Sequence, residues 1–331
     1  MFRIVRRALA LSAAAAMVSA ASAAAATPAT TTPTVPPKAA RGSLTLFLRD
    51  AFVVSHQVVS VPQRGVHADG VVRPYVPGQW VTVRAFLGRR MIKSDRLRVK
   101  PSANHSYGRF SERIASPGIG TVTVKAVHAR TAEQVGFDDQ RTFAALDERI
   151  GFGSTGRFVE LVQQRLAAMH FFLQRSGVYD SGTGLAIDAY HRLLGWGHAQ
   201  TLGGATISWL LNGFGAFRIR YPRHGRHAEG NLGKQLLALA DGSKIAYIFP
   251  ISSGKPSTPT VLGDFQIYRR NPGYLPDGMY FSSFFIGGYA IHGYNPAPDY
   301  PASHGCMRLP IADAITAYNW LTMGNWVDVY Y

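Results

Sequence analysis

The stretch that decides the fold of the C-terminal part reads Ser303-His304-Gly305-Cys306-Met307-Arg308-Leu309, and a second His-Gly pair, His292-Gly293, precedes it. Cys306 is the only cysteine in 331 residues, so the chain cannot form an internal disulfide. The thiol is therefore an inert core residue, an intermolecular link, a metal ligand or a nucleophile. Its neighbours favour the nucleophile, because glycines expose backbone N–H groups and an adjacent imidazole can lower a thiol pKa. Cys-His chemistry on an acyl group is the first hypothesis.

The spacing of these two pairs resembles the signature of the L,D-transpeptidase (YkuD) catalytic domain family. Two segments further upstream resemble the same family. The first comprises Ser253-Gly254-Lys255-Pro256, Thr258-Pro259-Thr260 and Gly263-Asp264-Phe265, and the second is Tyr280 with the run from Phe284 to His292. The resemblance covers roughly residues 230–331. It implies a mostly β catalytic domain with a helix after the nucleophile.

The resemblance also assigns roles to residues of the signature. Cys306 would be the acyl acceptor, and His292 would be the base that forms the thiolate. The backbone carbonyl of Gly293 would orient His292, as the third member of a triad does. The N–H groups of Gly305 and Cys306 would stabilise the oxyanion, each being worth roughly 3 kcal/mol in comparable sites.

Four further residues are expected to bind substrate or to shape the site. His304 lines the pocket and assists there, while Ser303 shapes the turn by hydrogen bonding. Tyr280 contributes a hydroxyl to the donor site. Arg308 replaces the Asn that often follows Cys-x in the family. Its guanidinium either binds a carboxylate of the stem peptide or anchors the catalytic loop to an acidic residue.

The implied reaction is attack by Cys306 on the bond between a diamino acid and the fourth-position D-Ala of a peptidoglycan stem. D-Ala leaves, and an amine of a neighbouring stem captures the thioester, which gives a 3→3 cross-link and a role in cell-wall biogenesis and cell shape. Water as acceptor would make the enzyme an L,D-carboxypeptidase, and a free D-amino acid would give exchange. Carbapenem-type β-lactams should trap the acyl-enzyme. No cofactor is implied.

Two other classes of function remain open at this stage. His292, His304 and Cys306 could be zinc ligands of a metal hydrolase, although Cys two residues after His is an unusual ligand spacing. A non-catalytic wall-binding protein would instead act through its N-terminal parts and would require an inactive Cys306. An inert buried thiol, the usual state of a lone cysteine, predicts slow alkylation by iodoacetamide near neutral pH.

The N-terminus predicts export. Arg3, Arg6 and Arg7 precede an apolar, alanine-rich run that ends at Ala26, which is typical of a secretory signal peptide at residues 1–26. An uncleaved membrane anchor is the alternative. Residues 27–42 are Thr/Pro-rich and predict an extended linker. The expected location is the cell wall or the periplasmic space.

The charge predicts an anionic partner. The formal net charge is +16 and falls to +13 without residues 1–26, which contain three arginines and no acid. Residues 41–150 hold 17 Lys and Arg against 9 Asp and Glu, so this domain would contact anionic cell-wall polymers. A basic surface that only aids solubility is the alternative. Export and the absence of a nucleic-acid-binding motif argue against nucleic acid.

Residues 43–147 predict an Ig-like β-sandwich. Apolar or alternating runs at 44–48, 80–86 and 121–127 have strand lengths, and Gly/Pro turn signals separate them. The whole chain therefore reads as a mainly β multidomain protein.

Residues 151–212 change to a helical period and predict a small three-helix bundle. One stripe runs from Phe158 to Met169, a second runs from Leu185 to Leu193 and ends at Gly195, and a third helix lies near 205–211. The order resembles the peptidoglycan-binding-1 domain. That resemblance rests on Gly156, Val159, Val162, Gln163 and Leu166 and on the run Ala186-Ile187-Asp188-Ala189-Tyr190-His191.

The catalytic domain and the linker that leads into it occupy residues 213–331. Arg218 to Gly230 read as a basic connector, in which His224 and His227 suggest a metal site but a solvated surface is favoured. Asp241-Gly242 predicts a hairpin between strands at 235–240 and 243–249. Further strands are expected at 265–268, 279–286, 289–292 and 325–331, with a helix that begins at Pro310.

Overall fold

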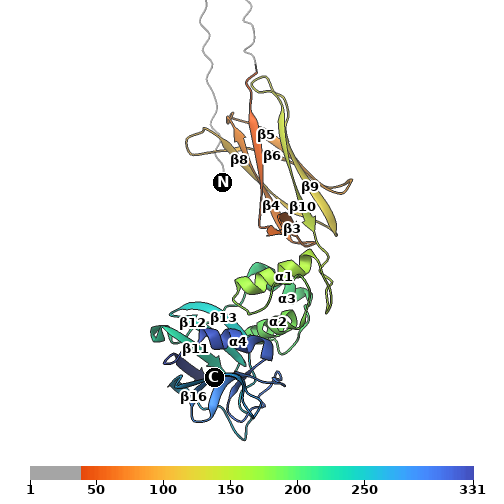
Figure 1. Ribbon diagram of the computed structural model, residues 1–331. Coiled ribbons are helices and arrows are strands. Elements are labelled where there is room, and N and C mark those ends of the chain that lie inside the picture. Colours follow the sequence, from red (N-terminus) through yellow and green to blue (C-terminus); the bar gives the residue numbers. More distant parts are fainter. Residues whose placement is uncertain (1–38) are drawn as a thin grey trace, which may run out of the picture. The chain divides into compact units, whose positions relative to one another are not determined.

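The structure, a computed structural model, describes residues 39–331 (Figure 1). The expected signal peptide at 1–26 and most of the expected linker at 27–42 lie outside the described residues. Along the described chain, ten strands come first, three helices follow, and a second group of strands then encloses one further helix. No helix among the described residues combines the length and the apolar character that crossing a bilayer requires.

The first region is a sandwich of two β-sheets whose apolar faces enclose one core. One sheet has the order β1 (Ser43–Arg49), β4 (Gly65–Arg73), β8 (Gly108–Ala115) and β7 (Lys100–Pro101). The other has the order β2 (Phe52–Val54), β3 (Gln57–Ser60), β10 (Phe137–Ala145), β9 (Gly120–His128), β5 (Trp80–Leu87) and β6 (Arg90–Arg98). Along β9, Val122, Val124 and Ala126 are buried, whereas Thr123 and Lys125 between them are not, as a strand with one face on a core requires. The predicted mainly β fold is confirmed.

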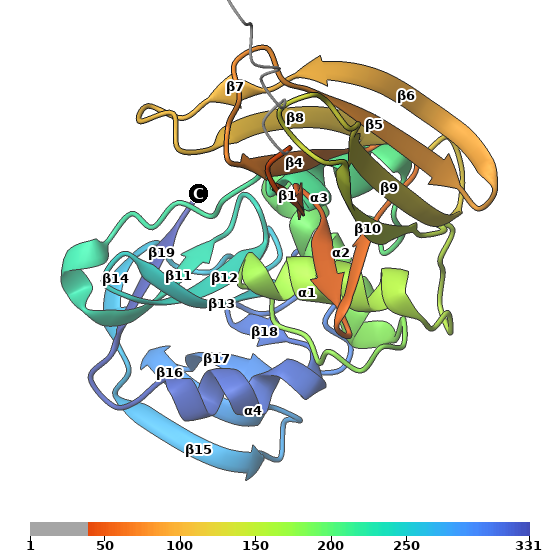
Figure 2. The same cartoon turned by 90° about the horizontal axis from the view of Figure 1, so that it is seen from above.

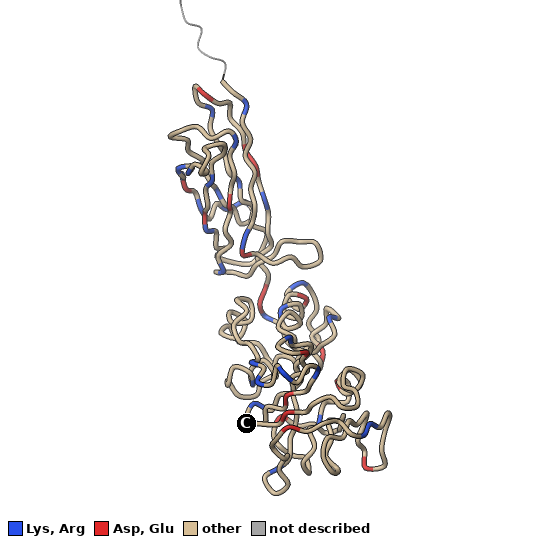
Figure 3. Tube along the Cα trace, turned by 90° about the vertical axis from the view of Figure 1, so that its left-hand side faces the viewer, with Lys and Arg blue, Asp and Glu red and all other residues tan. Residues whose placement is uncertain are grey.

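Basic residues outnumber acidic ones along this sandwich. Figure 3 shows Lys and Arg positions spread along its chain, with fewer Asp and Glu positions among them. Several form exposed ion pairs, among them Arg49 with Asp69 at 2.8 Å and Lys125 with Asp138 at 3.1 Å. Exposed pairs of this kind stabilise the fold only weakly. The surplus positive charge therefore lies on the surface of the sandwich and contributes little to its stability.

The second region contains the three predicted helices, α1 (Arg157–Ala168), α2 (Ser181–Leu194) and α3 (Gly204–Asn212). They lie beside one another in Figure 2. Asp180 caps the N-terminus of α2, and its Oδ1 accepts a hydrogen bond from the Thr183 N–H at 2.8 Å. The helix ends at Gly195, which adopts the left-handed conformation that favours glycine after a helix (φ 73°).

The helices share a hydrophobic core with the C-terminal domain. Leu236, Ala238 and Ile248 of that domain pack into the cluster that contains the buried faces of α1 and α2. Arg192 of α2 is buried there and pairs with Asp188 at 2.5 Å. Its Nη1 donates hydrogen bonds to the carbonyls of Gln235 and Ile251, each at 3.0 Å. The helical region is thus joined to the C-terminal domain by a buried cation as well as by apolar packing.

The C-terminal domain has two sheets, one α-helix and a short 3-10 helix, η1 (Pro222–His224). The first sheet has the order β13 (Lys244–Pro250), β12 (Leu236–Asp241), β11 (Arg226–Asn231), β19 (Trp326–Tyr330) and β14 (Gly263–Gln266). The second has the order β15 (Arg269–Tyr274), β16 (Tyr280–Ile286), β17 (Tyr289–Gly293) and β18 (Met307–Leu309). Helix α4 (Ile311–Trp320) contacts β16 and β17 (Figure 2). One apolar core lies between the sheets, so each sheet turns one face inward.

The interpretation of residues 218–230 as a solvated connector was wrong for its second half. Residues 226–231 form β11, the central strand of the five-stranded sheet, and His227 and Glu229 are fully buried. Glu229 accepts hydrogen bonds from the Tyr330 hydroxyl and from the Arg220 N–H, both at 2.7 Å. Because buried polar groups bond to one another on this face, the strand lacks the apolar alternation that would have predicted it.

Candidate active site

The pairing of β17 with β18 brings the two parts of the signature together. The strands run parallel, with Ile291 opposite Met307 and His292 opposite Arg308. Ile291 and Met307 point into the core between the sheets. Because side chains alternate along a strand, His292 and Arg308 lie on the other face, as does Cys306, two residues before Arg308. Nucleophile and base therefore lie on one side of one sheet.

A tight turn positions Cys306 just before β18. The buried Ser303 hydroxyl donates to the Cys306 carbonyl at 2.6 Å and accepts the Gly305 N–H at 3.1 Å. Gly305 has a φ of 116°, and a Cβ there would overlap the ring of Tyr289, so both backbone conformation and space require glycine. The Gly305 N–H, expected to stabilise the oxyanion, is bonded to Ser303, whereas that of Cys306 has no acceptor among the described residues.

A second segment, residues 253–255, holds this turn through backbone hydrogen bonds. The carbonyl of Ser253 accepts the N–H groups of Ala302 and Ser303, both at 2.9 Å, and the Lys255 N–H donates to the Ser303 carbonyl at 2.9 Å. A Cβ on Gly254 would overlap the backbone of the same segment, so this close approach needs glycine. In the sequence this segment stands out only by its resemblance to the family. Its structural role here is to bind the catalytic turn.

His292 is a neutral base in this structure. Its side chain is 2% exposed, and its Nδ1–H donates to the Gly293 carbonyl at 2.9 Å. This bond leaves the lone pair of Nε2 available. Burial lowers the pKa of His292 to about 4, and the positive charge of Arg308 adds to the effect. The imidazole is consequently unprotonated over the whole neutral range.

Cys306 is a neutral thiol at rest. The Ala290 N–H donates to its Sγ at 3.4 Å, and the S–H points to the Gly288 carbonyl at 3.8 Å. Burial raises the pKa of Cys306, although the Ala290 N–H and Arg308 oppose the rise. Within the described residues no hydrogen bond joins the thiol to His292. Rotation of the side chain must bring the S–H to Nε2 before the proton can move, and catalytic hydrogen bonds are often this loose before substrate binds.

Arg308 acts on both groups. Its guanidinium lies 4.0 Å above the ring of Tyr294 and contacts the Ala302 carbonyl at 3.5 Å. It forms no ion pair with any described carboxylate, and its buried Nε has no hydrogen-bond partner. The guanidinium therefore supplies a positive charge that no ion pair neutralises, although the more distant Asp277 has the opposite effect on the pKa of both groups. This suits the carboxylate-binding alternative better than an acidic anchor.

His304 and Tyr280 lie at the edges of the site. The exposed His304 has its Nε2 3.1 Å from the Lys255 ammonium, a contact that the sequence analysis missed because the two residues are far apart in the chain. Tyr280 pairs with Gly293 across β16 and β17, and its ring lies 4.3 Å from that of Tyr274. No described hydrogen bond engages its hydroxyl. The donor atoms of His292, His304 and Cys306 do not converge as three zinc ligands would.

Comparisons with known proteins agree with this geometry. Residues 225–329 match the family model of the L,D-transpeptidase catalytic domain, YkuD. A Bacillus subtilis (strain 168) protein named as the L,D-transpeptidase YkuD is 35% identical over 107 residues, which span 31% of this chain and 65% of that relative.

One solved structure extends the comparison. A crystal structure of an L,D-transpeptidase from Xylanimonas cellulosilytica DSM 15894 is similar with a TM-score of 0.51 and 30% identity, covering 56% of this chain and 98% of that one. Residues 225–329 make up less than 56% of this chain, so the structural similarity extends beyond the range that the family model matches.

Proposed function

The chain belongs, through residues 225–329, to the YkuD family of L,D-transpeptidase catalytic domains, and from this we propose that it is an exported enzyme that forms 3→3 peptidoglycan cross-links through a thioester on Cys306. One observation carries the proposal. The pairing of β17 with β18 puts a buried neutral imidazole and the only thiol of the chain on the same face of one sheet.

The first half-reaction forms the thioester. The thiol gives its proton to His292 Nε2 as Sγ attacks the carbonyl carbon of the third stem residue. The Cys306 N–H stabilises the oxyanion, joined by the Gly305 N–H once it leaves Ser303. As the carbon–nitrogen bond to D-Ala breaks, the imidazolium returns the proton to the leaving amine. Gly293 keeps the ring in the tautomer that both transfers need.

The second half-reaction consumes the thioester. An amine of a neighbouring stem attacks the acyl carbon, His292 accepts its proton, and the thiol is regenerated when the carbon–sulfur bond breaks. Water would give an L,D-carboxypeptidase, and a free D-amino acid would give exchange.

Two cations flank the nucleophile and suit an anionic substrate. Arg308 has no carboxylate partner among the described residues, and the Lys255 ammonium lies 3.1 Å from Nε2 of His304. A stem peptide carries free carboxylates, which a guanidinium binds in bidentate fashion. We assign Arg308 and Lys255 to carboxylates of the donor stem, with Tyr280 at the rim.

The N-terminal regions would hold the enzyme at the wall. The three-helix region would bind peptidoglycan, and the basic sandwich would contact anionic wall polymers. Location in the cell wall or the periplasmic space follows from the predicted signal peptide.

The test is the intact mass of the purified protein after incubation with a carbapenem, beside the variant Cys306→Ala. We expect one adduct per chain on the parent and none on the variant. A disaccharide-tetrapeptide substrate then distinguishes a cross-linked dimer from a tripeptide, the product of hydrolysis. A parent that takes no adduct and makes neither product, yet still sediments with purified wall, would instead identify a non-catalytic wall-binding protein.

A further inference from the structure

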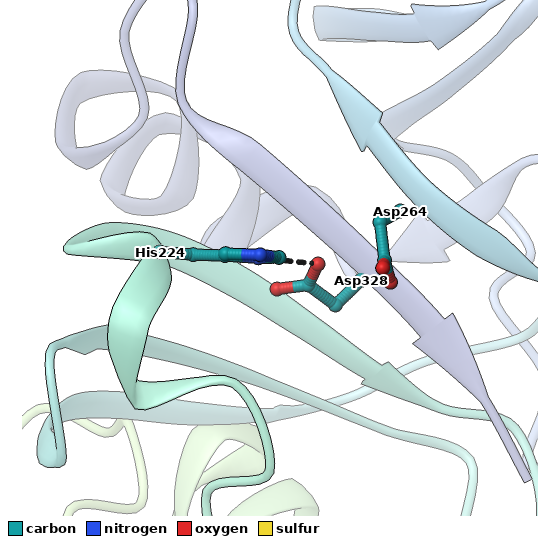
Figure 4. A group of neighbouring side chains, drawn as sticks. All are labelled: His224, Asp264 and Asp328. Carbon is teal, nitrogen blue, oxygen red and sulfur yellow. Dashed lines mark hydrogen bonds and ion pairs between the residues drawn. The ribbon is translucent and has the colours of Figure 1, made fainter.

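A second cluster of chemically active side chains lies away from the catalytic sheet. It consists of His224, Asp264 and Asp328 (Figure 4). His224 comes from the short helix η1 (Pro222–His224), Asp264 from β14 and Asp328 from β19. The strands β14 and β19 belong to the five-stranded sheet, whereas Cys306 and His292 are carried by the other sheet. Any activity of this cluster is therefore separate from the proposed transpeptidation.

The backbone forces the two carboxylates together. Strands β14 and β19 pair antiparallel with Asp264 directly opposite Asp328, so both side chains lie on one face of the sheet. Like charges directly opposite one another destabilise a strand pair. Sequence and register thus create a repulsion that only a proton or a cation relieves.

Asp328 is the least satisfied member of the cluster. Its side chain is fully buried, and its Oδ1 lies 2.9 Å from Nδ1 of His224. Its other oxygen, Oδ2, is buried without a hydrogen-bond partner. An unpaired oxygen on a buried carboxylate is costly. Figure 4 shows the Asp328 and His224 groups facing each other, with the Asp264 carboxylate beside them.

We propose that His224, Asp264 and Asp328 bind one divalent transition-metal ion, with Zn²⁺ the best match. One donor atom from each residue lies within 4.8 Å of the other two, a separation that one ion can bridge. Two carboxylates balance the charge of a divalent cation. An imidazole nitrogen with two carboxylate oxygens suits Zn²⁺, whereas Mg²⁺ and Ca²⁺ prefer oxygen ligands alone. Because Asp264 is exposed, the ion has a route from solvent and room for a water ligand.

A simple ion pair between His224 and Asp328 is the competing explanation. It accounts for Oδ1 of Asp328 but leaves Oδ2 unpaired and Asp264 without a role. A divalent ion would instead engage the unpaired Asp328 oxygen and give Asp264 a role as a ligand.

The side chains around His224 hold its imidazole ring in one orientation, as the surroundings of a metal ligand do. The imidazole stacks on Trp326 with 4.5 Å between ring centroids and lies 5.5 Å from Tyr221. Such neighbours orient a metal ligand before the ion arrives. A bound ion would tie η1, which leads into the catalytic domain, to β14 and β19.

The test is calorimetric titration of the chelator-treated full chain with ZnCl₂, carried out in a Cys306→Ala background so that the thiol cannot bind the metal. We expect one Zn²⁺ per chain and a higher melting temperature, because the ion binds only the folded state. Replacing one ligand, as in His224→Gln or Asp264→Asn, should weaken binding at least about tenfold. Both positions reach solvent, so these variants should fold, which melting curves without metal will establish.

A matched control comes from the helical region. His198 lies 3.7 Å from Asp188 but has no third ligand, so His198→Gln should leave zinc binding unchanged. Zinc affinity that is the same in the parent, His224→Gln and Asp264→Asn would overturn the proposal, as would no zinc binding at all. Equal affinity for Ca²⁺ would overturn the assignment to a transition metal.

Discussion

Two buried histidines of the catalytic domain have opposite protonation behaviour. His292 and His227 are both almost completely inaccessible to solvent, at 2% and 0% exposure. His292 bonds to a neutral carbonyl, and burial lowers its pKa to about 4. Burial is the largest influence on His227 and opposes its charged form, but the hydrogen bonds to Glu229 and to the Gly225 carbonyl, together with the nearby negative charges, outweigh burial and raise the pKa. Burial alone does not determine the protonation state of a histidine, because the charge of its hydrogen-bond partners also shifts the pKa.

The largest effect that this comparison predicts concerns the base. His292→Gln should slow acylation of Cys306 by a carbapenem by roughly 10²- to 10⁴-fold, since general-base catalysis is lost. The measurement is the rate of adduct formation by mass spectrometry. Equal acylation rates in the parent and the variant would mean that the thiol ionises without His292.

The second prediction removes the negative partner of the other histidine. Glu229→Gln leaves His227 in a buried place without its counter-charge and should lower the free energy of unfolding by about 3 kcal/mol. Urea denaturation measures the loss. Acylation of the remaining folded protein should keep the parent rate, because Glu229 belongs to a different sheet from Cys306. A slower acylation rate per folded molecule would show that the two sheets are coupled.

The third prediction uses the dependence of stability on pH. The folded pKa of His292 lies below its unfolded value, so the unfolded state binds more protons in acid. The stability from neutral His292 is present above about pH 6.5 and is lost as the pH falls towards 4. Between pH 8 and 5, the parent should therefore lose about 2 kcal/mol relative to His292→Gln.

For His227 the sign is reversed. Its folded pKa lies above the unfolded value, so its contribution is present below about pH 6.5 and lost as the pH rises through the folded pKa. The free energy of unfolding of His227→Gln should accordingly fall furthest below that of the parent in acid. Differences that change with pH in the same direction for both variants would contradict the comparison.

The smallest expected effect concerns the positive charge beside the base. Removing it with Arg308→Gln should move the acid limb of the acylation rate to higher pH, because Arg308 helps to lower the pKa of His292. Single-turnover measurement just after transfer to each pH avoids a contribution from unfolding. Lys255→Gln is the matched control, since Lys255 contacts His304 and not the base. A limb that moves equally in both variants would rule out a specific effect of Arg308.

The sequence predicted the elements whose signal is local. The turn around Cys306, the hairpin at Asp241-Gly242 and helix α2 with its terminal Gly195 each depend on neighbouring residues. Strand β11 was missed because its buried side chains are polar, and their partners lie elsewhere in the chain.

The same reason explains what was missed at the two sites. Lys255 reaches His304 only because Gly254 and Ser303 are bridged across the fold. His224, Asp264 and Asp328 meet only through the pairing of β14 with β19 and the position of η1. Spacing along the chain carries no information about such meetings. The sequence offered a metal at His224 and His227 only as the less favoured alternative to a solvated surface, and it gave no indication that two carboxylates lie beside His224.

The buried Arg192 limits how this protein can be divided. Its guanidinium binds the carbonyl of Gln235, whose side-chain amide donates to the Ser253 hydroxyl at 2.8 Å, and the Ser253 carbonyl binds the catalytic turn. A fragment that begins at residue 213 would expose Leu236, Ala238 and Ile248. It would also leave the Gln235 carbonyl without the guanidinium that donates to it. For protein engineering, the helices and the catalytic domain are therefore one exchangeable unit. A chimaera that takes its catalytic domain from this chain must also take the face of α2 that carries Arg192.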